Sequence, residues 1–312
     1  MLKKPCPLFT FSSKAAIMEG DQTDKDTAMR CVTQTLEIAK RIGTERALRL
    51  LAESGFDGAD LTMTDVRGEA FSDPTFSERI RLVSGELGLP ITQAHAPFPG
   101  KRYGDEEYSR LYDGYVRTAI RTAAQVGAGC IVVHPIHCPT LSAAQQMEWN
   151  LEYYRQLGVL ARQEGVRIAL ENMYGYRDGR HCPNVCSLSE ELAAYADALD
   201  DPLFTVCADL GHFPLVGEDT PHAIRCLAGR LGALHVHDND WRNDTHTVPY
   251  LGINPWDEIT SALAEVDYRG DLTFETDKGY LPHLPEELFA SALRHLCQVG
   301  KHLISEIERK RP

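Results

Sequence analysis

The chain alternates short apolar runs with longer segments that carry apolar residues at helical spacing, and it does so eight times. The apolar runs, which we interpret as strands, cover residues 29–36, 58–62, 90–95, 130–134, 166–171, 203–209, 234–237 and 272–275. The helices expected after them cover residues 44–54, 76–87, 108–126, 142–164, 188–199, 221–231, 256–266 and 288–307. Strands that alternate with helices form parallel sheets. Eight such units in 312 residues predict a single-domain α/β fold, the closed (β/α)8 or TIM barrel.

An open, doubly wound sheet is the alternative arrangement of alternating strands and helices. Sheets of that kind that bind dinucleotides carry a glycine-rich turn after the first strand. No such turn follows residues 29–36, so the closed barrel is favoured.

Residues 1–28 differ from the rest of the chain. Residues 21–26 are polar and show no periodicity, and Pro5 and Pro7 interrupt any regular element before them. A segment rich in β-branched residues begins at Met29. We therefore expect residues 1–28 to be an N-terminal extension and a candidate for disorder, and residues 29–312 to form the barrel. Residues 8–11, Leu-Phe-Thr-Phe, are a competing candidate for the first strand.

The composition argues against several classes of partner. The chain has 32 basic and 45 acidic residues, a formal net charge of -13, so the basic face that nucleic acids and anionic membranes require is not expected. No apolar run approaches the ~20 residues of a membrane span, and the N-terminus lacks the apolar core of a signal peptide. The nine cysteines are scattered, mostly in apolar runs, as in proteins of a reducing compartment. We therefore expect a cytoplasmic protein without nucleic-acid or membrane partners.

Six of the expected strands end in a histidine or a carboxylate. These end residues are His95, His134, Glu171, Asp209, His237 and Glu275. One histidine at a strand end is ordinarily a hydrogen-bonded rim residue, but the same pattern in six strands is hard to explain strand by strand. In a (β/α)8 barrel the carboxyl ends of all strands meet at one mouth, where active sites lie. We therefore expect these six side chains to converge on one site.

Four of these residues form a candidate metal site. Glu171, Asp209, His237 and Glu275 end the fifth to eighth strands, so they form a contiguous arc of the mouth. Three carboxylates and one imidazole favour Mn2+, Mg2+ or Co2+ over a thiolate-type zinc site, with Zn2+ also compatible. Without a cation the clustered carboxylates would repel one another, and their pKa values would rise. We predict one bound divalent metal ion.

Further histidines surround this arc. His235 lies two residues before His237, and so on the same face of the strand, and we interpret it as a core or supporting residue rather than a ligand. His212 follows Asp209 by three residues, so a loop can return it over the site. His246, in the next polar loop, is either a site residue or a solvated loop residue.

The strand ends and the loops after them resemble one family, the xylose-isomerase-like barrels. This family includes sugar isomerases, sugar epimerases, inosose isomerase and dehydratase relatives, and endonuclease IV. The matching stretches are Ala94-His95-Ala96-Pro97, Val133-His134-Pro135, Leu170-Glu171-Asn172-Met173, Ala208-Asp209-Leu210-Gly211-His212, His235-Val236-His237-Asp238-Asn239-Asp240 and Phe274-Glu275-Thr276. They follow the family order over the chain from residue 30 onward. The Asp-Leu-Gly-His and His-Val-His-Asp-Asn-Asp runs are the more specific ones.

The resemblance implies a function and a role for each matching residue. Family epimerases hold a divalent metal through the residues that match Glu171, Asp209, His237 and Glu275, and the two glutamates also act as the acid–base pair. One glutamate removes a proton from the carbon next to a carbonyl, and the resulting enediolate is protonated at the same or the neighbouring carbon. The resemblance also implies that His212 contacts substrate oxygens. The remaining pocket residues that it implies are His95, His134 and His246.

One position departs from the pattern of the ketose epimerases. They carry a second acidic residue six positions after the first glutamate, whereas this chain has Arg177 there. An arginine favours an acidic or phosphorylated substrate, so we predict Arg177 to be a substrate-binding residue. Together these features predict a metal-dependent isomerase or epimerase of a small carbohydrate or carbohydrate derivative. Members of the family often form dimers or tetramers, so a homo-oligomer is expected.

Other activities remain open. A lyase, dehydratase or deglycosylating enzyme that acts on an oxidised sugar would begin with the same proton abstraction, so residue spacing does not separate it from an isomerase.

Endonuclease IV holds three zinc ions, and each type of ligand that it uses has a counterpart here: His95, His134, Glu171, Asp209, His212, His237, Asp244, His246 and Glu275. The acidic net charge argues against a nucleic-acid substrate, because phosphate binding relies on Lys and Arg contacts. A binding protein without activity would not need both glutamates.

Overall fold

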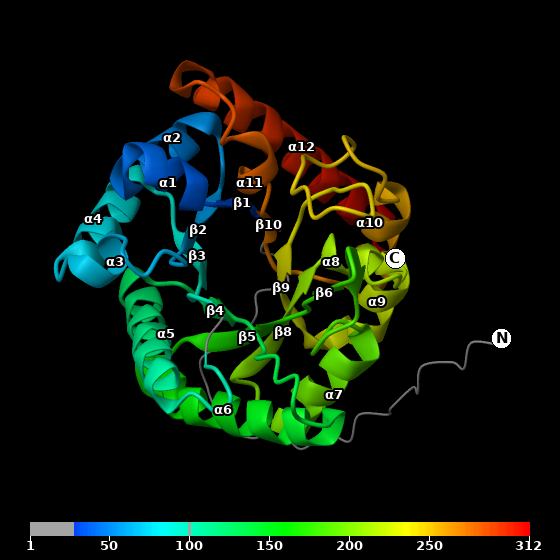
Figure 1. The fold of residues 1–312 in the computed structure, drawn as a ribbon. Helices are drawn as coiled ribbons and strands as arrows, with labels where there is room; N and C mark the ends of the chain where they lie inside the picture. Colours follow the sequence, from blue (N-terminus) through cyan, green and yellow to red (C-terminus); the bar gives the residue numbers. More distant parts are fainter. Residues whose placement is uncertain (1–27, 99–100) are drawn as a thin grey trace.

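Eight parallel strands curve round a common axis, and helices cover the outside of the ring that they form (Figure 1). The structure, a computed structural model, describes residues 28–98 and 101–312. The strands of the ring are β1 Cys31–Gln34, β2 Gly58–Thr62, β3 Ile91–His95, β4 Cys130–Val133, β5 Arg167–Glu171, β8 Phe204–Asp209, β9 Leu231–His235 and β10 Leu272–Phe274. They pair in the order β10-β1-β2-β3-β4-β5-β8-β9. The predicted (β/α)8 barrel is confirmed. The predictions for residues 1–27, including the alternative strand at 8–11, lie outside the described residues.

The ring closes between β9 and β10. These two strands meet at a single bridge, where Val236 lies beside Phe274. The N–H of Val236 donates to the carbonyl oxygen of Thr273 at 2.8 Å, and the N–H of Glu275 donates to that of Val236 at 3.1 Å. His237 and Glu275 therefore follow directly on the bridge, from neighbouring strands.

The long helices lie outside the strands, whereas the short α8 and α11 lie closer to the mouth of the ring (Figure 1). Their bounds are α1 Leu36–Ile42, α2 Thr44–Ser54, α3 Glu69–Ser72, α4 Phe76–Leu87, α5 Glu106–Val126, α6 Ala143–Glu164, α7 Ser189–Leu199, α8 His212–Leu215, α9 Thr220–Leu227, η1 Ala228–Arg230, α10 Trp256–Glu265, α11 Asp277–Tyr280, η2 Glu286–Leu288 and α12 Phe289–Lys310. Among the helices that the structure describes, none is both long enough and apolar enough to cross a membrane.

Several boundaries differ from the sequence prediction, most clearly in the first strand and in the segment before β9. The first strand ends at Gln34 instead of running to residue 36, and α1 begins at Leu36. The helix predicted for residues 221–231 ends at Leu227, because Ala228 has a φ of 41°, which a helix interior does not allow. A 3-10 turn follows. The next strand, β9, covers Leu231–His235 instead of residues 234–237, so His237 lies two residues beyond its end.

A β-hairpin that the sequence analysis did not identify follows β5. It consists of β6 Gly175–Arg177 and β7 Arg180–Cys182, which pair in antiparallel register. Asp178 and Gly179 form its turn with φ values of 53° and 77°, as the two-residue hairpin turn requires. The Asp-Gly pair was the available sequence signal for this element.

The apolar side chains inside the barrel are small. Cys130, Val132, Ala169, Cys207 and Ala233 form a buried cluster that is separate from the large core between strands and helices. Bulky branched residues ordinarily fill the inside of such a barrel. Smaller ones leave room for polar side chains at the carboxyl ends of the strands.

The loop between β9 and α10 is organised by one buried carboxylate. Asp238 accepts hydrogen bonds from the N–H groups of Asn239 and Asn254 on Oδ1, at 2.9 and 3.0 Å. Its Oδ2 accepts from the N–H of Tyr250 at 3.0 Å and from the indole of Trp256 at 2.7 Å. Four donors thus converge on one buried side chain, and they hold the loop that follows His237 in position.

We predict that Asp238→Ala lowers the free energy of unfolding by about 2–4 kcal/mol, because it leaves several buried donors without an acceptor. Urea denaturation followed by fluorescence measures the loss. Asp240→Ala is the matched control: Asp240 lies in the same loop but is exposed, and its removal should cost less than about 1 kcal/mol. Equal losses in the two variants would contradict the prediction.

Candidate functional site

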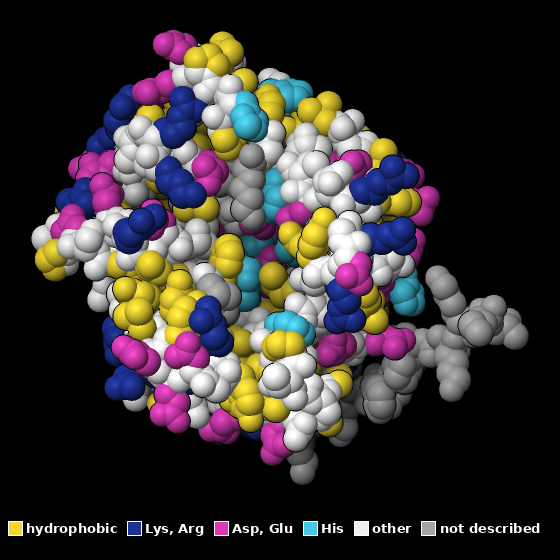
Figure 2. Space-filling model, in the orientation of Figure 1, with side chains coloured by type: hydrophobic (Ala, Val, Ile, Leu, Met, Phe, Trp, Pro, Cys, Tyr) yellow, Lys and Arg dark blue, Asp and Glu magenta, His cyan; other side chains and the backbone are white. Residues whose placement is uncertain are grey.

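The polar side chains predicted at the strand ends converge on the carboxyl-terminal mouth of the barrel. Figure 2 shows this face hollowed at its centre, with histidine and carboxylate side chains inside the hollow. Glu171 and Asp209 are the last residues of β5 and β8, and Glu275 directly follows β10. All three carboxylates are buried. Buried carboxylates are stable only with positive charge or hydrogen-bond donors beside them.

Glu171 lies at the centre of the first group of side chains. Its Oε2 is 2.9 Å from Nε2 of His134 and 3.3 Å from Nε2 of His95. Its Oε1 is 2.9 Å from Nδ1 of His235. The same nitrogen of His235 is 3.0 Å from Oε2 of Glu275. His235 therefore bridges the two glutamates.

Asp209 is held in place by its neighbours in the chain and on the next strand. The side-chain amide of Asn172 donates to the carbonyl oxygen of Asp209 at 2.9 Å, and the N–H of Asp209 donates back to Asn172 Oδ1 at 2.7 Å. Asp209 Oδ1 accepts from the N–H groups of Gly211 and His212, at 2.8 and 3.0 Å, and lies 3.0 Å from Nε2 of His237. The carboxylate therefore faces His237 in a fixed orientation.

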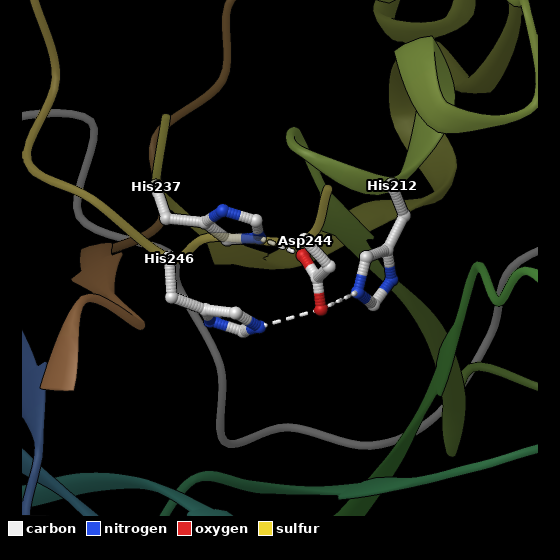
Figure 3. Close-up of side chains that lie close together, drawn as sticks. All are labelled: His212, His237, Asp244 and His246. Carbon is white, nitrogen blue, oxygen red and sulfur yellow. Dashed lines mark hydrogen bonds and ion pairs between the residues drawn. The ribbon is translucent and has the colours of Figure 1, made fainter. Parts of the chain in front are cut away.

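A further group, called the upper group below, contacts Asp209 and combines residues of the segment just after β9, of the loop that follows and of α8 (Figure 3). It consists of His212, His237, Asp244 and His246. Asp244 Oδ2 is 2.8 Å from Nε2 of His246 and 3.8 Å from Nε2 of His212, and its Oδ1 is 3.7 Å from Nε2 of His237. The rings of His237 and His246 stack with centroids 4.1 Å apart. Tyr174 donates its hydroxyl to Asp244 Oδ2 at 2.9 Å.

The loops are shaped to let these rings approach. Gly211 lies so close to the imidazole of His237 that a Cβ at this position would overlap the ring. His246 has a φ of 46°, a conformation that few residues adopt, and its Nδ1 lies 2.7 Å from the carbonyl oxygen of Glu275. Strained backbone of this kind persists where the surrounding structure requires it and clusters at functional sites.

The imidazoles compensate the charge of Glu171. Burial alone would raise the pKa of Glu171, but His235 and His134 beside it hold this pKa well below its usual range. The carboxylate is therefore ionised, and it is available as a base or a ligand at neutral pH.

In the upper group, neighbouring carboxylates raise the pKa values of two histidines. Burial alone would lower the pKa of His212, but Asp209 and Asp244 raise it to about 10. The pKa of His237 is also raised, against the effect of burial, because Asp209 and Asp244 face it. Both imidazoles therefore hold a proton more tightly than a free imidazole does.

The donor atoms fit a divalent cation. Three sets of side chains place one ligand atom each within 4.8 Å of one another: His95, His134 and Glu171; Glu171, Asp209, His235 and Glu275; and His212, His237, Asp244 and His246. Within the described residues, Nε2 of His235, Nδ1 of His237 and Oδ1 of Asp244 are buried without a hydrogen-bond partner. Imidazole nitrogens and carboxylate oxygens of this kind suit Mn2+, Co2+, Mg2+ and Zn2+.

The structure brings most of the predicted site residues together. Three of the four predicted ligands, Glu171, Asp209 and Glu275, share one set, in which His235 is the imidazole. The fourth, His237, contacts Asp209 but belongs to the set of Asp244. The predicted pocket residues within these sets are His95, His134, His212 and His246. The ligand and substrate roles themselves stay predictions.

Arg177 is placed differently from the other predicted site residues. It lies exposed in β6, where its backbone pairs with Arg180, and within the described part of the chain it belongs to none of the three sets. Two residues that the sequence analysis did not single out do contact the site, namely Tyr174 and Asn172. Asn172 directly follows Glu171, which was a usable signal, whereas nothing in the sequence pattern points to Tyr174.

A cavity of about 300 Å3 opens beside the first group. His134, Phe98, Tyr108 and Tyr174 are among the residues that line it, and the ring of Phe98 stacks on that of His134 with centroids 4.6 Å apart. Its size lies at the lower end of the range of ~300–1,000 Å3 for small-molecule pockets. The mouth therefore has room for a ligand that extends beyond the carboxylates.

Residues 48–299 match the family model described as xylose isomerase-like TIM barrel. The chain belongs to this family. It is 26% identical over 254 residues to an uncharacterized protein of Mycobacterium leprae, covering 74% of this chain and 83% of that protein. It is also 26% identical to a fructoselysine 3-epimerase of Shigella flexneri, covering 78% of this chain and 88% of that protein. A solved D-tagatose 3-epimerase-like structure superimposes with a TM-score of 0.73 at 19% identity, covering 90% and 99% of the two chains.

We predict that Gly211→Ala in this xylose isomerase-like barrel displaces the ring of His237 and weakens metal binding by about tenfold or more. The added Cβ has no room beside the imidazole. Manganese titration of the purified variant measures the affinity. Gly114→Ala is the control, since a Cβ at Gly114 on α5 meets nothing within 4 Å. Metal affinity equal to that of the wild type in Gly211→Ala would contradict the prediction.

Metal affinity should also depend on pH. Imidazoles bind metals in their neutral form, and the raised pKa values of His212 and His237 mean that protons must leave when a metal binds there. Lowering the pH from about 8 to about 6 should therefore weaken binding, by up to about tenfold per pH unit for each proton released. Calorimetric titration with Mn2+ in two buffers of different ionisation enthalpy counts these protons, and pH-independent affinity would be inconsistent with this assignment.

Proposed function

We propose that this chain is a divalent-metal-dependent isomerase or epimerase of a sugar or sugar derivative, which transfers a proton at a carbon next to a carbonyl group. The observation that carries the proposal is the approach of Glu171 and Glu275 to one atom, Nδ1 of His235, at 2.9 and 3.0 Å. Two buried carboxylates from different strands therefore border the same small space. Acid–base chemistry at one carbon needs this arrangement, in which one group removes a proton and a second returns it.

The names of the relatives support the class of substrate. The relative from Shigella flexneri is a fructoselysine 3-epimerase, and the superimposed structure is named as D-tagatose 3-epimerase-like. An epimerase inverts one carbon, so a C–H bond breaks on one face of the substrate and forms on the other. The distinction between isomerase and epimerase rests on which carbon is protonated at the end.

The chain's own residues have separate tasks in the proposed reaction. Glu171 or Glu275 removes the carbon-bound proton, and the electron pair of the C–H bond moves toward the carbonyl oxygen to give an enediolate. The other glutamate enters this step protonated and donates its proton to the carbon, so the two carboxyl groups exchange protonation states over one turnover. His95 and His134 contact Glu171 and orient it. Burial excludes water from these carboxylates, so their interactions with the substrate are stronger than they would be in solvent.

A divalent cation would be held by Glu171, Asp209 and Glu275 together with His237, and His235 lies against two of the same carboxylates. When bound, it supplies positive charge that stabilises the negative charge developing on the substrate oxygens. Mn2+, Mg2+ or Co2+ fits the oxygen-rich set best, and Zn2+ is compatible.

A metal-dependent phosphoester hydrolase is the second candidate. The observation that favours it is the upper group, because His212, Asp244 and His246 offer ligands for a further ion beside those of Asp209. Multinuclear sites of this kind catalyse phosphoester hydrolysis. The net charge of -13 disfavours a nucleic-acid substrate.

A lyase acting on an oxidised sugar shares the first step, proton abstraction, with the proposed isomerase. The two activities are distinguished by their products.

The metal content of the purified protein separates the two candidates. We expect about one Mn, Mg or Co ion per chain in the wild type, lost in Asp209→Ala because the carboxylate at the centre of the set is gone. Mass spectrometry of protein prepared without chelator measures this, with Asp240→Ala as the control that keeps its metal. Two or three zinc ions per chain would favour the hydrolase. A chain that binds no metal under any loading condition would exclude both candidates.

Glu171→Gln and Glu275→Gln test the acid–base pair. Each variant should lower the rate of proton exchange between a ketose and deuterated water by about a hundredfold to ten-thousandfold, since an amide cannot accept the proton. Nuclear magnetic resonance measures exchange, and circular dichroism confirms folding. Glu190→Gln, an exposed position on α7, serves as the control. Exchange as fast as in the wild type would remove that glutamate from the proposed role.

A further inference from the structure

Gln34, the last residue of β1, has its side chain inside the barrel. Side chains alternate between the two faces of a strand. Cys31 packs outward, because its sulfur lies where a Cβ on Gly300 of α12 would be. Val32 and Gln34 therefore point inward. Gln34 is 1% exposed, so it is as deeply buried as the candidate metal ligands.

The register of the sheet places Gln34 beside Asp60 of β2 on one side and next to the end of β10 on the other. Gln34 pairs with Asp60 of β2, and Thr33 pairs with Phe274 of β10. Gln34 and Glu275 are the next residues after this last pair, so we infer that they lie level with each other. Residues in register on parallel strands present their side chains on the same face. The side chain of Gln34 is thus expected on the same face of the sheet as that of Glu275, inside the barrel.

Neither polar atom of the Gln34 amide has a hydrogen-bond partner among the described residues. Its neighbours differ in this respect. Gln93, the amide on the other side of Asp60, donates to Asp60 Oδ2 at 2.8 Å, and Thr62 donates to Asp60 Oδ1 at 3.1 Å. Burying a polar group without a partner destabilises a fold, and an apolar residue of the same size would avoid that cost. A buried amide of which neither the oxygen nor the nitrogen is used indicates a ligand contact.

We propose that the side-chain amide of Gln34 binds a hydroxyl group of the substrate close to the carbon on which Glu275 acts. The inference rests on the proposed function and goes beyond it, because it specifies how the substrate is recognised. An amide offers one acceptor and one donor group, and a hydroxyl group likewise both accepts and donates. A phosphate or carboxylate only accepts, so it would leave Gln34 Oε1 without a partner. Gln34 therefore selects a neutral polyhydroxylated segment at this end of the substrate.

Replacement of Gln34 by methionine tests the proposal on stability first. Methionine has similar length and no hydrogen-bonding amide, so Gln34→Met should leave the midpoint of thermal unfolding unchanged or raise it. Gln93→Met is the matched control, since it removes an amide that is paired with Asp60 and should lower the midpoint. A loss of stability in Gln34→Met as large as in Gln93→Met would assign Gln34 a structural role and overturn the proposal.

Ligand binding gives the second test. The manganese-loaded wild type and Gln34→Met are titrated calorimetrically with D-fructose and with fructose analogues that each lack one hydroxyl group. We expect the wild type to bind the parent ketose about tenfold to a hundredfold more tightly than one of the analogues, and Gln34→Met to lose that preference. The same preference in both proteins, or no binding of any ketose, would overturn the inference.

The proposed reaction and the proposed role of Gln34 can be disproved separately. If proton exchange is absent with every ketose while Gln34→Met still removes the preference for one hydroxyl group, the proposed reaction is wrong and the role of Gln34 stands. If exchange occurs and Gln34→Met has the same KM and the same hydroxyl preference as the wild type, the reaction stands and the role of Gln34 is wrong.

Discussion

The structure depends on the pairing of buried carboxylates with imidazoles. Glu171, Asp209 and Glu275 lie in the low-dielectric inside of a barrel, where like charges at this spacing would repel one another strongly. His235 relieves this repulsion by contacting two of the three at once. For Glu171 the pairing also holds the pKa well below its usual range despite burial, so this carboxylate is in the state that both metal binding and proton abstraction need.

There is a physical reason why the sequence predicted the barrel and most of the side chains at its mouth. In a parallel barrel all carboxyl ends meet, so a residue's position at the end of a strand is enough to place it at the mouth. Glu171 and Asp209 are the last residues of their strands, as predicted. His235 and His237 show the limit of such an argument. Because they lie on the same strand face, alternation alone could not decide which of the two approaches Glu171.

Other features depended on information that strand patterns do not carry. Ala228 ends α9 early through its backbone conformation, which its residue type does not suggest. Asp244 and Tyr174 meet across two loops, and contacts between loops follow from tertiary structure rather than from local spacing. Gln34 lies in a run of residues that resembles any polar strand end, and only the sheet register relates it to Glu275.

The closure of the barrel has a consequence for its cohesion. Most neighbouring strands share several backbone pairs, but β9 and β10 share one bridge, and His237 and Glu275 lie immediately beyond it. The junction between β9 and β10, where the ring closes, therefore lies at the candidate metal site. A cation bound by residues from both strands would hold them together. Because it would bind only when the ring is closed, its binding energy would stabilise the closed ring. Without a cation, the backbone bonding across this junction that involves Val236 consists of two hydrogen bonds, with Thr273 and Glu275.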